Sequence, residues 1–166
     1  MNSLDFVSKE LKKIKGKKVV LTGGCFDLIH IGHVRLLNKA KTQGDILVIG
    51  IDNDQCIRER KGENRPVIPA EQRMELLLGF KSVDYVFITH DLYADENLKK
   101  IKPDILVLGK EKGKIRRRKI TANKIEKKYP GIKVIFLSSG VSEICSTNIE
   151  NRILRNYRGF SKDKVL

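Results

Sequence analysis

The sequence has few cysteines and few aromatic residues. Its 166 residues include three cysteines and no tryptophan, and aromatic residues make up only 6%. Cys25, Cys56 and Cys145 are far apart and form no C-x-x-C pair, so neither a disulfide framework nor a zinc site is indicated. We therefore expect reduced thiols and a cytoplasmic protein. The low aromatic content also disfavours a stacking platform for single-stranded nucleic acid.

Long apolar runs are missing as well. No segment approaches the roughly 20 apolar residues needed to cross a bilayer. The first 18 residues, MNSLDFVSKELKKIKGKK, lack the apolar core of a signal peptide. We therefore expect no membrane association. The length and a hydrophobic content of 40% fit one globular domain with its own core.

Acidic residues are too few to balance the basic ones. The chain has 34 Lys and Arg against 20 Asp and Glu, a formal net charge of +14. Much of the excess lies in residues 12–18, KKIKGKK, and 110–119, KEKGKIRRRK. Such charge attracts nucleic acid, acidic membranes and phosphorylated metabolites alike. It leaves a basic nucleic-acid-binding module open as an alternative function, and a basic run is also typical of a solvated face.

Short apolar runs alternate with amphipathic segments along the chain. The runs are rich in Val, Ile and Leu and mostly lack polar alternation, as in parallel strands buried on both faces. They predict strands over residues 19–22, 46–51, 85–88, 105–108 and 134–137. Proline before a segment and glycine or proline after it mark helix ends, which predicts helices over residues 3–14, 34–42, 70–80, 96–100, 121–128 and 147–155. This order predicts a single-domain α/β fold, a doubly wound, Rossmann-like sheet of about five parallel strands.

A glycine turn and two histidines follow the first predicted strand. Residues 23–33 read GGCFDLIHIGH, which puts His30 and His33 where a helix should begin. Backbone N–H groups and the dipole at a helix N-terminus favour phosphate. The alternative is that the histidines only cap the helix. In such sheets ligands bind at the carboxyl ends of the strands, and the basic loop 110–119 should face the same crevice.

Other phosphate-binding motifs are absent. Asp52 stands where a dinucleotide-binding fold would hold a ribose hydroxyl, but Gly23 and Gly24 are adjacent and G-x-G-x-x-G is missing. The P-loop pattern G-x-x-x-x-G-K-[ST] is missing too. Hydride transfer is therefore disfavoured.

Three segments resemble a known family. Residues 24–33 resemble the G-x-F-D-x-x-H-x-G-H signature of the cytidylyltransferase-like nucleotidyltransferases. Residues 61–73, KGENRPVIPAEQR, and 146–149, STNI, are most similar to D-glycero-β-D-manno-heptose 1-phosphate adenylyltransferases. The resemblance covers about residues 17–153. It divides the single domain (1–166) into an N-terminal helical extension (1–16), a core (17–153) and a C-terminal tail (154–166).

The resemblance implies nucleotidyl transfer from a nucleoside triphosphate (NTP) to a phosphorylated small molecule, with release of pyrophosphate. A phosphate monoester is ionised near neutrality, so it needs placement and charge stabilisation rather than a general base. The implied catalytic residues are His30, His33 and Lys61. The implied nucleotide- or phosphate-binding residues are Gly24, Cys25, Phe26, Asp27, Arg73, Gly109, Lys110, Ser146 and Thr147, and Arg65 is the implied substrate-binding residue.

Each of these assignments has a purely structural alternative. Asp27 is also a common type of residue at a helix start, Ser146 and Thr147 are ordinary helix caps, and Lys61, Arg65 and Arg73 suit a solvated surface. Magnesium should arrive with the NTP, because no dedicated carboxylate cluster is visible. The family also suggests a homodimer.

The substrate is less well defined than the reaction. Residues 61–73 favour ATP and a heptose 1-phosphate. After the fourth strand, however, the chain has LGKEK over residues 108–112, where those adenylyltransferases usually carry Lys-Gly-Gly-Asp-Tyr. Cys145 also replaces a serine common in the family. A cytidylyltransferase that uses CTP with glycerol 3-phosphate or another alcohol or amino-alcohol phosphate is therefore the alternative.

Overall fold

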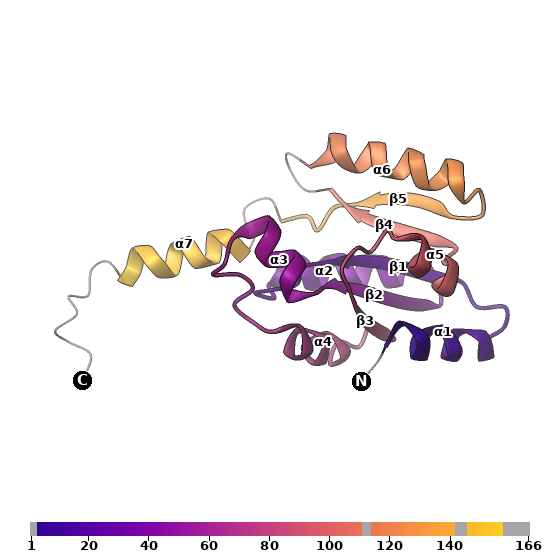
Figure 1. Cartoon of the computed structure of the whole chain (residues 1–166), viewed down its shortest axis with the longest axis horizontal. Helices are drawn as coiled ribbons and strands as arrows, with labels where there is room; N and C mark the ends of the chain where they lie inside the picture. Colours follow the sequence, from indigo (N-terminus) through magenta and orange to yellow (C-terminus); the bar gives the residue numbers. More distant parts are fainter. Residues whose placement is uncertain (1–2, 111–113, 142–145, 158–166) are drawn as a thin grey trace.

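The structure, a computed structural model, describes residues 3–110, 114–141 and 146–157. Its centre is a sheet of five parallel strands in the order β3-β2-β1-β4-β5 (Figure 1). The strands are β1 (Val19–Gly24), β2 (Ile46–Asp52), β3 (Tyr85–Thr89), β4 (Ile105–Gly109) and β5 (Lys133–Leu137). The predicted doubly wound α/β fold is confirmed, and each strand lies within two residues of its predicted bounds.

The strand order reverses between β1 and β4. From β1 the chain moves outward through β2 to β3, then crosses back to the other side of β1 for β4 and β5. Thr22 pairs with Val107 across the reversal, so the residues after β1 and after β4 leave the sheet side by side. Crevices at such a reversal are the usual ligand sites of open α/β sheets.

Helices cover both faces of the sheet. On one face α1 (Leu4–Lys13), α5 (Asp95–Ile101) and α6 (Ile115–Lys128) pack against strand residues that include Leu21, Val48 and Leu106. On the other, α2 (Ile31–Lys41) and α4 (Ala70–Leu78) pack against residues that include Val20, Leu47 and Ile49. Side chains alternate between faces along each strand, and both faces of β1 and β2 are buried. This explains why these strands read as continuous apolar runs.

Three helices differ from the sequence prediction. Helix α2 begins at Ile31 rather than at residue 34. No helix is predicted between residues 51 and 70, but a short helix, α3 (Asp54–Lys61), occupies part of this segment. The side chain of Asn53 accepts from the Cys56 N–H (2.8 Å) and caps its start. The basic segment 110–119 is also not wholly a loop, since α6 begins at Ile115 rather than near residue 121.

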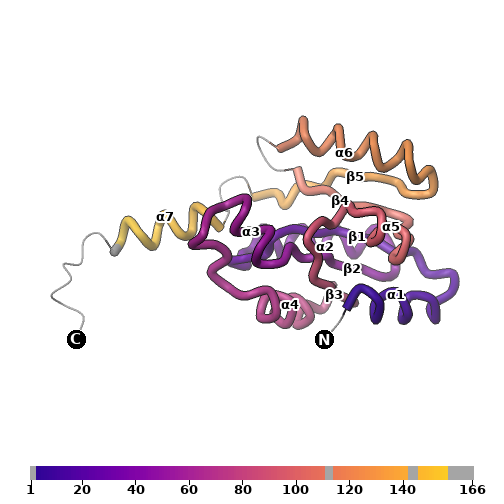
Figure 2. The backbone as a smooth tube through the Cα atoms, viewed as in Figure 1, coloured from indigo at the N-terminus to yellow at the C-terminus, as the bar shows by residue number. Residues whose placement is uncertain are grey.

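The last helix, α7 (Ser146–Tyr157), begins as predicted within one residue. It extends away from the sheet, as the cartoon and the backbone tube both show (Figures 1 and 2). No helix in the described part of the chain is both long and apolar enough to cross a membrane.

Candidate active site

The glycine turn leaves β1 at Gly24 and buries its aromatic residue. Phe26 takes a positive φ of 46° and is only 4% exposed, and its ring packs 5.0 Å from that of His33. Positive φ is unusual for a bulky residue and is often retained at functional sites. The side chain of Phe26 therefore supports the turn, and Gly24 and half-buried Cys25 form its more open part.

His30 and His33 are held together by reciprocal hydrogen bonds at the start of α2. The Gly32 N–H donates to Nδ1 of His30 (3.1 Å), and the His30 N–H donates to Nδ1 of His33 (3.4 Å). The rings stack with centroids 3.8 Å apart. Because both Nδ1 atoms accept, both rings are neutral and carry their proton on Nε2. The site thus contains two adjacent Nε2–H donors at a helix N-terminus.

Gly32 is required for this arrangement. A Cβ at this position would lie 2.9 Å from both Cε1 and Nδ1 of His30, closer than carbon atoms approach without displacement. The ring of His30 therefore lies over the backbone of Gly32, which only a residue without a side chain allows.

Asp27 is completely buried and joins the glycine turn to the segment that follows α3. One carboxylate oxygen accepts from the Val67 N–H (2.8 Å) and the Ile68 N–H (3.0 Å). The other forms an ion pair with Arg65. Both oxygens are thus used by protein donors, so Asp27 orients the glycine turn, and phosphate contact by its side chain stays a prediction.

Arg65 contacts a second carboxylate as well. It is 6% exposed, and its guanidinium bridges Asp27 to Glu150 of α7. The two ion pairs raise the pKa of Arg65 against the opposing effect of burial. The sequence prediction assigns Arg65 to the substrate, whereas the structure surrounds its guanidinium with these two acids.

Arg73 lies beneath the site with no exposed surface. Its guanidinium donates to the carbonyls of Ile68 (2.8 Å), Cys25 (2.5 Å) and Asp52 (2.9 Å). It also forms an ion pair with Asp54 (2.6 Å). Arg73 therefore connects the glycine turn, the end of β2 and the start of α3. It is not a solvated helix arginine, and phosphate contact by its side chain stays a prediction.

The end of α3 carries Lys61. Its side chain is exposed, and Gly62 follows with a φ of +99° that ends the helix. Asp52, at the end of β2, is paired with Arg60 of α3, which raises the pKa of the arginine. The carboxylate that a dinucleotide site would offer to ribose is thus occupied by a protein cation.

The segments after β4 and β5 lie on the other side of the strand reversal. Lys110 is exposed, and its N–H bonds to the carbonyl of Leu137 (2.8 Å). The Ser146 hydroxyl donates to the carbonyl of Leu28 (3.2 Å), which places the start of α7 against the glycine turn. Thr147 is exposed beside it. Cys145 and residues 111–113 lie outside the described residues.

The first turn of α6 concentrates positive charge. It contains Arg116, Arg117 and Arg118 and no acidic residue. Basic side chains at a helix N-terminus oppose the helix dipole and lower the stability of the helix. The same concentration of positive charge, which lies beside the end of β4, favours the binding of anions there. Arg118 donates to the carbonyl of Gly109, which links this charge to the end of β4.

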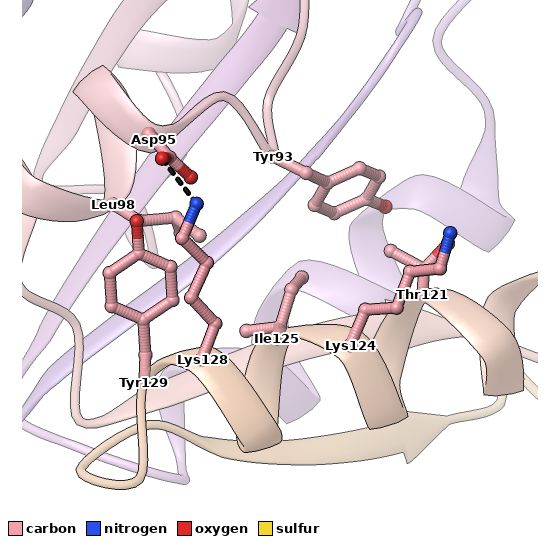
Figure 3. A pocket seen from close by; sticks show the side chains of 8 residues that line it. All are labelled: Tyr93, Asp95, Leu98, Thr121, Lys124, Ile125, Lys128 and Tyr129. Carbon is pink, nitrogen blue, oxygen red and sulfur yellow. Dashed lines mark hydrogen bonds and ion pairs between the residues drawn. The ribbon is translucent and has the colours of Figure 1, made fainter.

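A separate cavity of about 200 Å³ lies between α6 and the segment before α5 (Figure 3). The hydroxyl of Tyr93 points toward Thr121 and Lys124, and Lys128 pairs with Asp95 at the other end. Burial raises the pKa of Tyr93, with the positive charge of Arg118 acting in the opposite direction. None of the lining residues belongs to the glycine turn or to α2.

Within the described ranges, no group of three or more His, Cys, Asp or Glu side chains is arranged to hold a metal ion. Glu150 is a site-forming residue that is not predicted from the sequence. Thr147 and Glu150 fit the pattern T-x-x-E of a helix capping box, so the local sequence gives a misleading signal. The partner of Glu150 is instead Arg65, 85 residues earlier.

The fold, the strand reversal and the paired histidines are those expected of a nucleotidyltransferase. The chain belongs to the cytidylyltransferase-like family, whose pattern matches residues 21–149. The match includes the glycine turn, the segment 61–73 and the start of α7, so the family resemblance stated from the sequence is confirmed.

Among curated proteins, the chain is similar to bifunctional proteins HldE. It is 38% identical over 149 residues to that of Geobacter metallireducens, which covers 89% of this chain and 29% of the relative. It is 45% identical over 112 residues to that of Nitratiruptor sp., covering 67% of this chain and 24% of the relative. The chain thus spans less than a third of the length of these relatives.

Solved structures share the fold. A lipopolysaccharide core biosynthesis protein from Thermoplasma volcanium is 30% identical with a TM-score of 0.61, covering 74% of this chain and 96% of the other. A pantoate-beta-alanine ligase from Francisella tularensis reaches the same TM-score at 17% identity, covering 100% and 81%. The second likeness concerns the fold alone.

Proposed function

We propose that this nucleotidyltransferase transfers the adenylyl group of ATP to a sugar 1-phosphate, a heptose 1-phosphate in the first instance. The observation that carries the proposal is the pair of neutral, stacked imidazoles at the N-terminus of α2, beside the strand reversal. Similarity to bifunctional proteins HldE over 89% of the chain supports the sugar phosphate, as does the resemblance of residues 61–73.

In the reaction, a phosphate oxygen of the acceptor attacks the α-phosphorus of the NTP. The bond from that phosphorus to the bridging oxygen of the β-phosphate breaks, and pyrophosphate leaves. Charge builds on the α-phosphate and on the leaving group. The Nε2–H groups of His30 and His33 are donors suited to those oxygens, and donors already in place cost no reorganisation as charge develops.

Lys61 and the other basic residues would act on the phosphates from outside the turn. A lysine at the end of a short helix, followed by a glycine, can close over bound triphosphate and exclude water. We assign Lys110, Ser146 and Thr147 to the opposite side, where backbone N–H groups at the start of α7 favour phosphate. Asp27 and Arg73 would keep the glycine turn in place beneath them.

Magnesium would supply charge neutralisation on the triphosphate when bound. The donor set fits a metal that arrives with the nucleotide, because the two oxygens of Asp27 already accept three protein donors. We therefore expect the ion to bind mainly through phosphate oxygens.

Pyrophosphate release from ATP, magnesium and a panel of sugar and alcohol phosphates tests the proposal. We expect release with a sugar 1-phosphate and little with glycerol 3-phosphate. No pyrophosphate with any acceptor, together with no NTP binding, would contradict an enzyme of this class.

A CTP-dependent reaction with glycerol 3-phosphate or a related phosphate is the second candidate. It stays open because residues 108–112, LGKEK, depart from the Lys-Gly-Gly-Asp-Tyr that the heptose enzymes usually carry after the same strand. Because a ligand of the native state raises the apparent melting temperature, thermal shifts with ATP and CTP separate the two. A larger shift with CTP would contradict the adenylyl proposal.

A further inference from the structure

Arg65 connects three segments that surround the candidate site. It is itself in the segment after α3, and its guanidinium forms ion pairs with Asp27 of the glycine turn and Glu150 of α7. These residues lie 38 and 85 positions away in the sequence. The bridge therefore fixes how the C-terminal helix meets the turn.

The two ends of the bridge are held to different degrees. Asp27 has no exposed surface and also accepts two backbone N–H groups, from Val67 and Ile68. Glu150 is 33% exposed and belongs to a helix that leaves the body of the protein. Arg65 is thus anchored by the turn and offers its second side to α7.

The remainder of α7 contributes little packing. The side chains of residues 151–156 are exposed, with Ile153 at 50% and Leu154 at 52%. At the start of the helix, Ser146 is 9% exposed and bonds to the carbonyl of Leu28. Docking of the start of α7 therefore depends strongly on the polar contacts of its first two turns, among which the pair of Glu150 with Arg65 carries full charges.

We propose that Glu150 is a positioning residue for nucleotide binding. Through Arg65 it holds the first turn of α7 against the glycine turn, so that Ser146 and Thr147 face the triphosphate from the side opposite His30 and His33. The inference rests on the proposed function for the identity of the ligand. Glu150 itself touches neither the nucleotide nor the acceptor.

The test compares Glu150→Ala and Glu150→Gln with Glu75→Gln as the control. Glu75 is exposed on α4 and forms no ion pair among the described residues. We expect Glu150→Ala to raise KM for ATP about tenfold, since a hydrogen bond between charged groups contributes about that factor, with kcat changed less than about twofold. Glu150→Gln keeps an acceptor and should show a smaller rise.

Hydrogen exchange of residues 146–150 without nucleotide supplies a readout that is independent of activity. We expect faster exchange in both Glu150 variants and unchanged exchange in Glu75→Gln. Exchange equal to that of the unaltered protein, or a loss of kcat at constant KM, would overturn the positioning role. If the unaltered protein binds no NTP, the proposed function fails, and the exchange result still decides whether Glu150 docks α7.

Discussion

His30 and His33 are the residues whose geometry most directly determines the proposed chemistry. Their Nδ1 atoms accept backbone N–H groups, so each ring has one orientation and one proton position. We expect His30→Ala and His33→Ala each to lower kcat about a hundredfold, the typical loss for one donor to a developing negative charge. ATP affinity should fall less than the rate, because the contacts strengthen as charge develops.

Steady-state kinetics check this prediction, and thermal unfolding shows whether the fold survives. His90→Ala is the matched control, since His90 is 57% exposed and lies outside the paired rings. Near-normal turnover in both variants of the histidine pair would refute the mechanism, whichever acceptor is used.

Substitution of Gly32 tests whether the position of the His30 ring matters, because it leaves both imidazoles in the protein. In Gly32→Ala, the added Cβ would lie 2.9 Å from the His30 ring, so the ring must move away from its hydrogen bond. We expect a large loss of kcat with little net change in thermal stability, because the better helix propensity of alanine offsets the loss of the bond that caps α2. Gly131→Ala is the control, since a Cβ there meets no atom within 4 Å. Full activity of Gly32→Ala would show that the ring position is not required.

Substitution of Asp27 should lower the stability of the fold rather than act directly on the chemical step. Without its carboxylate, buried Arg65 keeps only Glu150 as an ion-pair partner, and the Val67 and Ile68 N–H groups lose their acceptor. Breaking a buried ion pair typically costs about 3–5 kcal/mol. We expect Asp27→Ala to lower the free energy of unfolding by about that amount, as measured in urea. Asp5→Ala breaks an exposed pair with Lys100 and should cost less than about 1 kcal/mol. Equal costs would contradict the anchoring role of Asp27.

At the scale of elements, the sequence predicts the sheet well because its strands are buried on both faces. Continuous runs of Val, Ile and Leu of that length, bounded by turn residues, are typical of such strands. Helix α3 is not predicted because its sequence, DQCIRERK, has only two apolar positions and so shows no helical periodicity. The N-cap Asn53 and the terminal Lys61-Gly62 pair are the signals that mark it. The start of α6 is not predicted correctly because the first turn is a basic run, and basic residues at a helix N-terminus oppose the helix dipole.

Part of the candidate site can be predicted from the sequence and part cannot. The local motif at residues 24–33 indicates the paired histidines, since both partners of each hydrogen bond lie within three residues. The contacts of Arg65 and Arg73 could not be predicted, because their partners are brought together only by the folded sheet. Side chains that look like phosphate ligands in the sequence therefore have protein acceptors as neighbours.

Lys61, the last residue of α3, is predicted to close over the bound triphosphate. We expect Lys61→Ala to raise KM for ATP and to lower kcat, as for a cation that closes over phosphates. Gly62→Ala should have a related effect, because a φ of +99° is strained for any residue with a side chain. Lys99→Ala, on α5, is the control. Unchanged kinetics in Lys61→Ala would exclude the closing role.

At the scale of the whole molecule, the family predicts a homodimer. Two large apolar side chains are exposed on α4, Leu76 at 49% and Leu78 at 39%, and they are candidates for a contact between copies. Light scattering should give twice the 18.9 kDa of one chain. A mass of one chain at micromolar concentration would contradict the prediction.

The net charge of +14 separates the enzyme from a nucleic-acid-binding module. Binding driven by phosphate neutralisation weakens steeply with salt and does not depend on two particular imidazoles. We expect any binding to DNA or RNA duplexes to be lost at physiological salt, whereas ATP should still raise the melting temperature there. His30→Ala should leave duplex binding at low salt unchanged while it abolishes most turnover.

Duplex binding that persists at physiological salt, without any response to ATP or CTP, would favour the nucleic-acid function. In that case the first turn of α6, with its three consecutive arginines, would be the surface to substitute first.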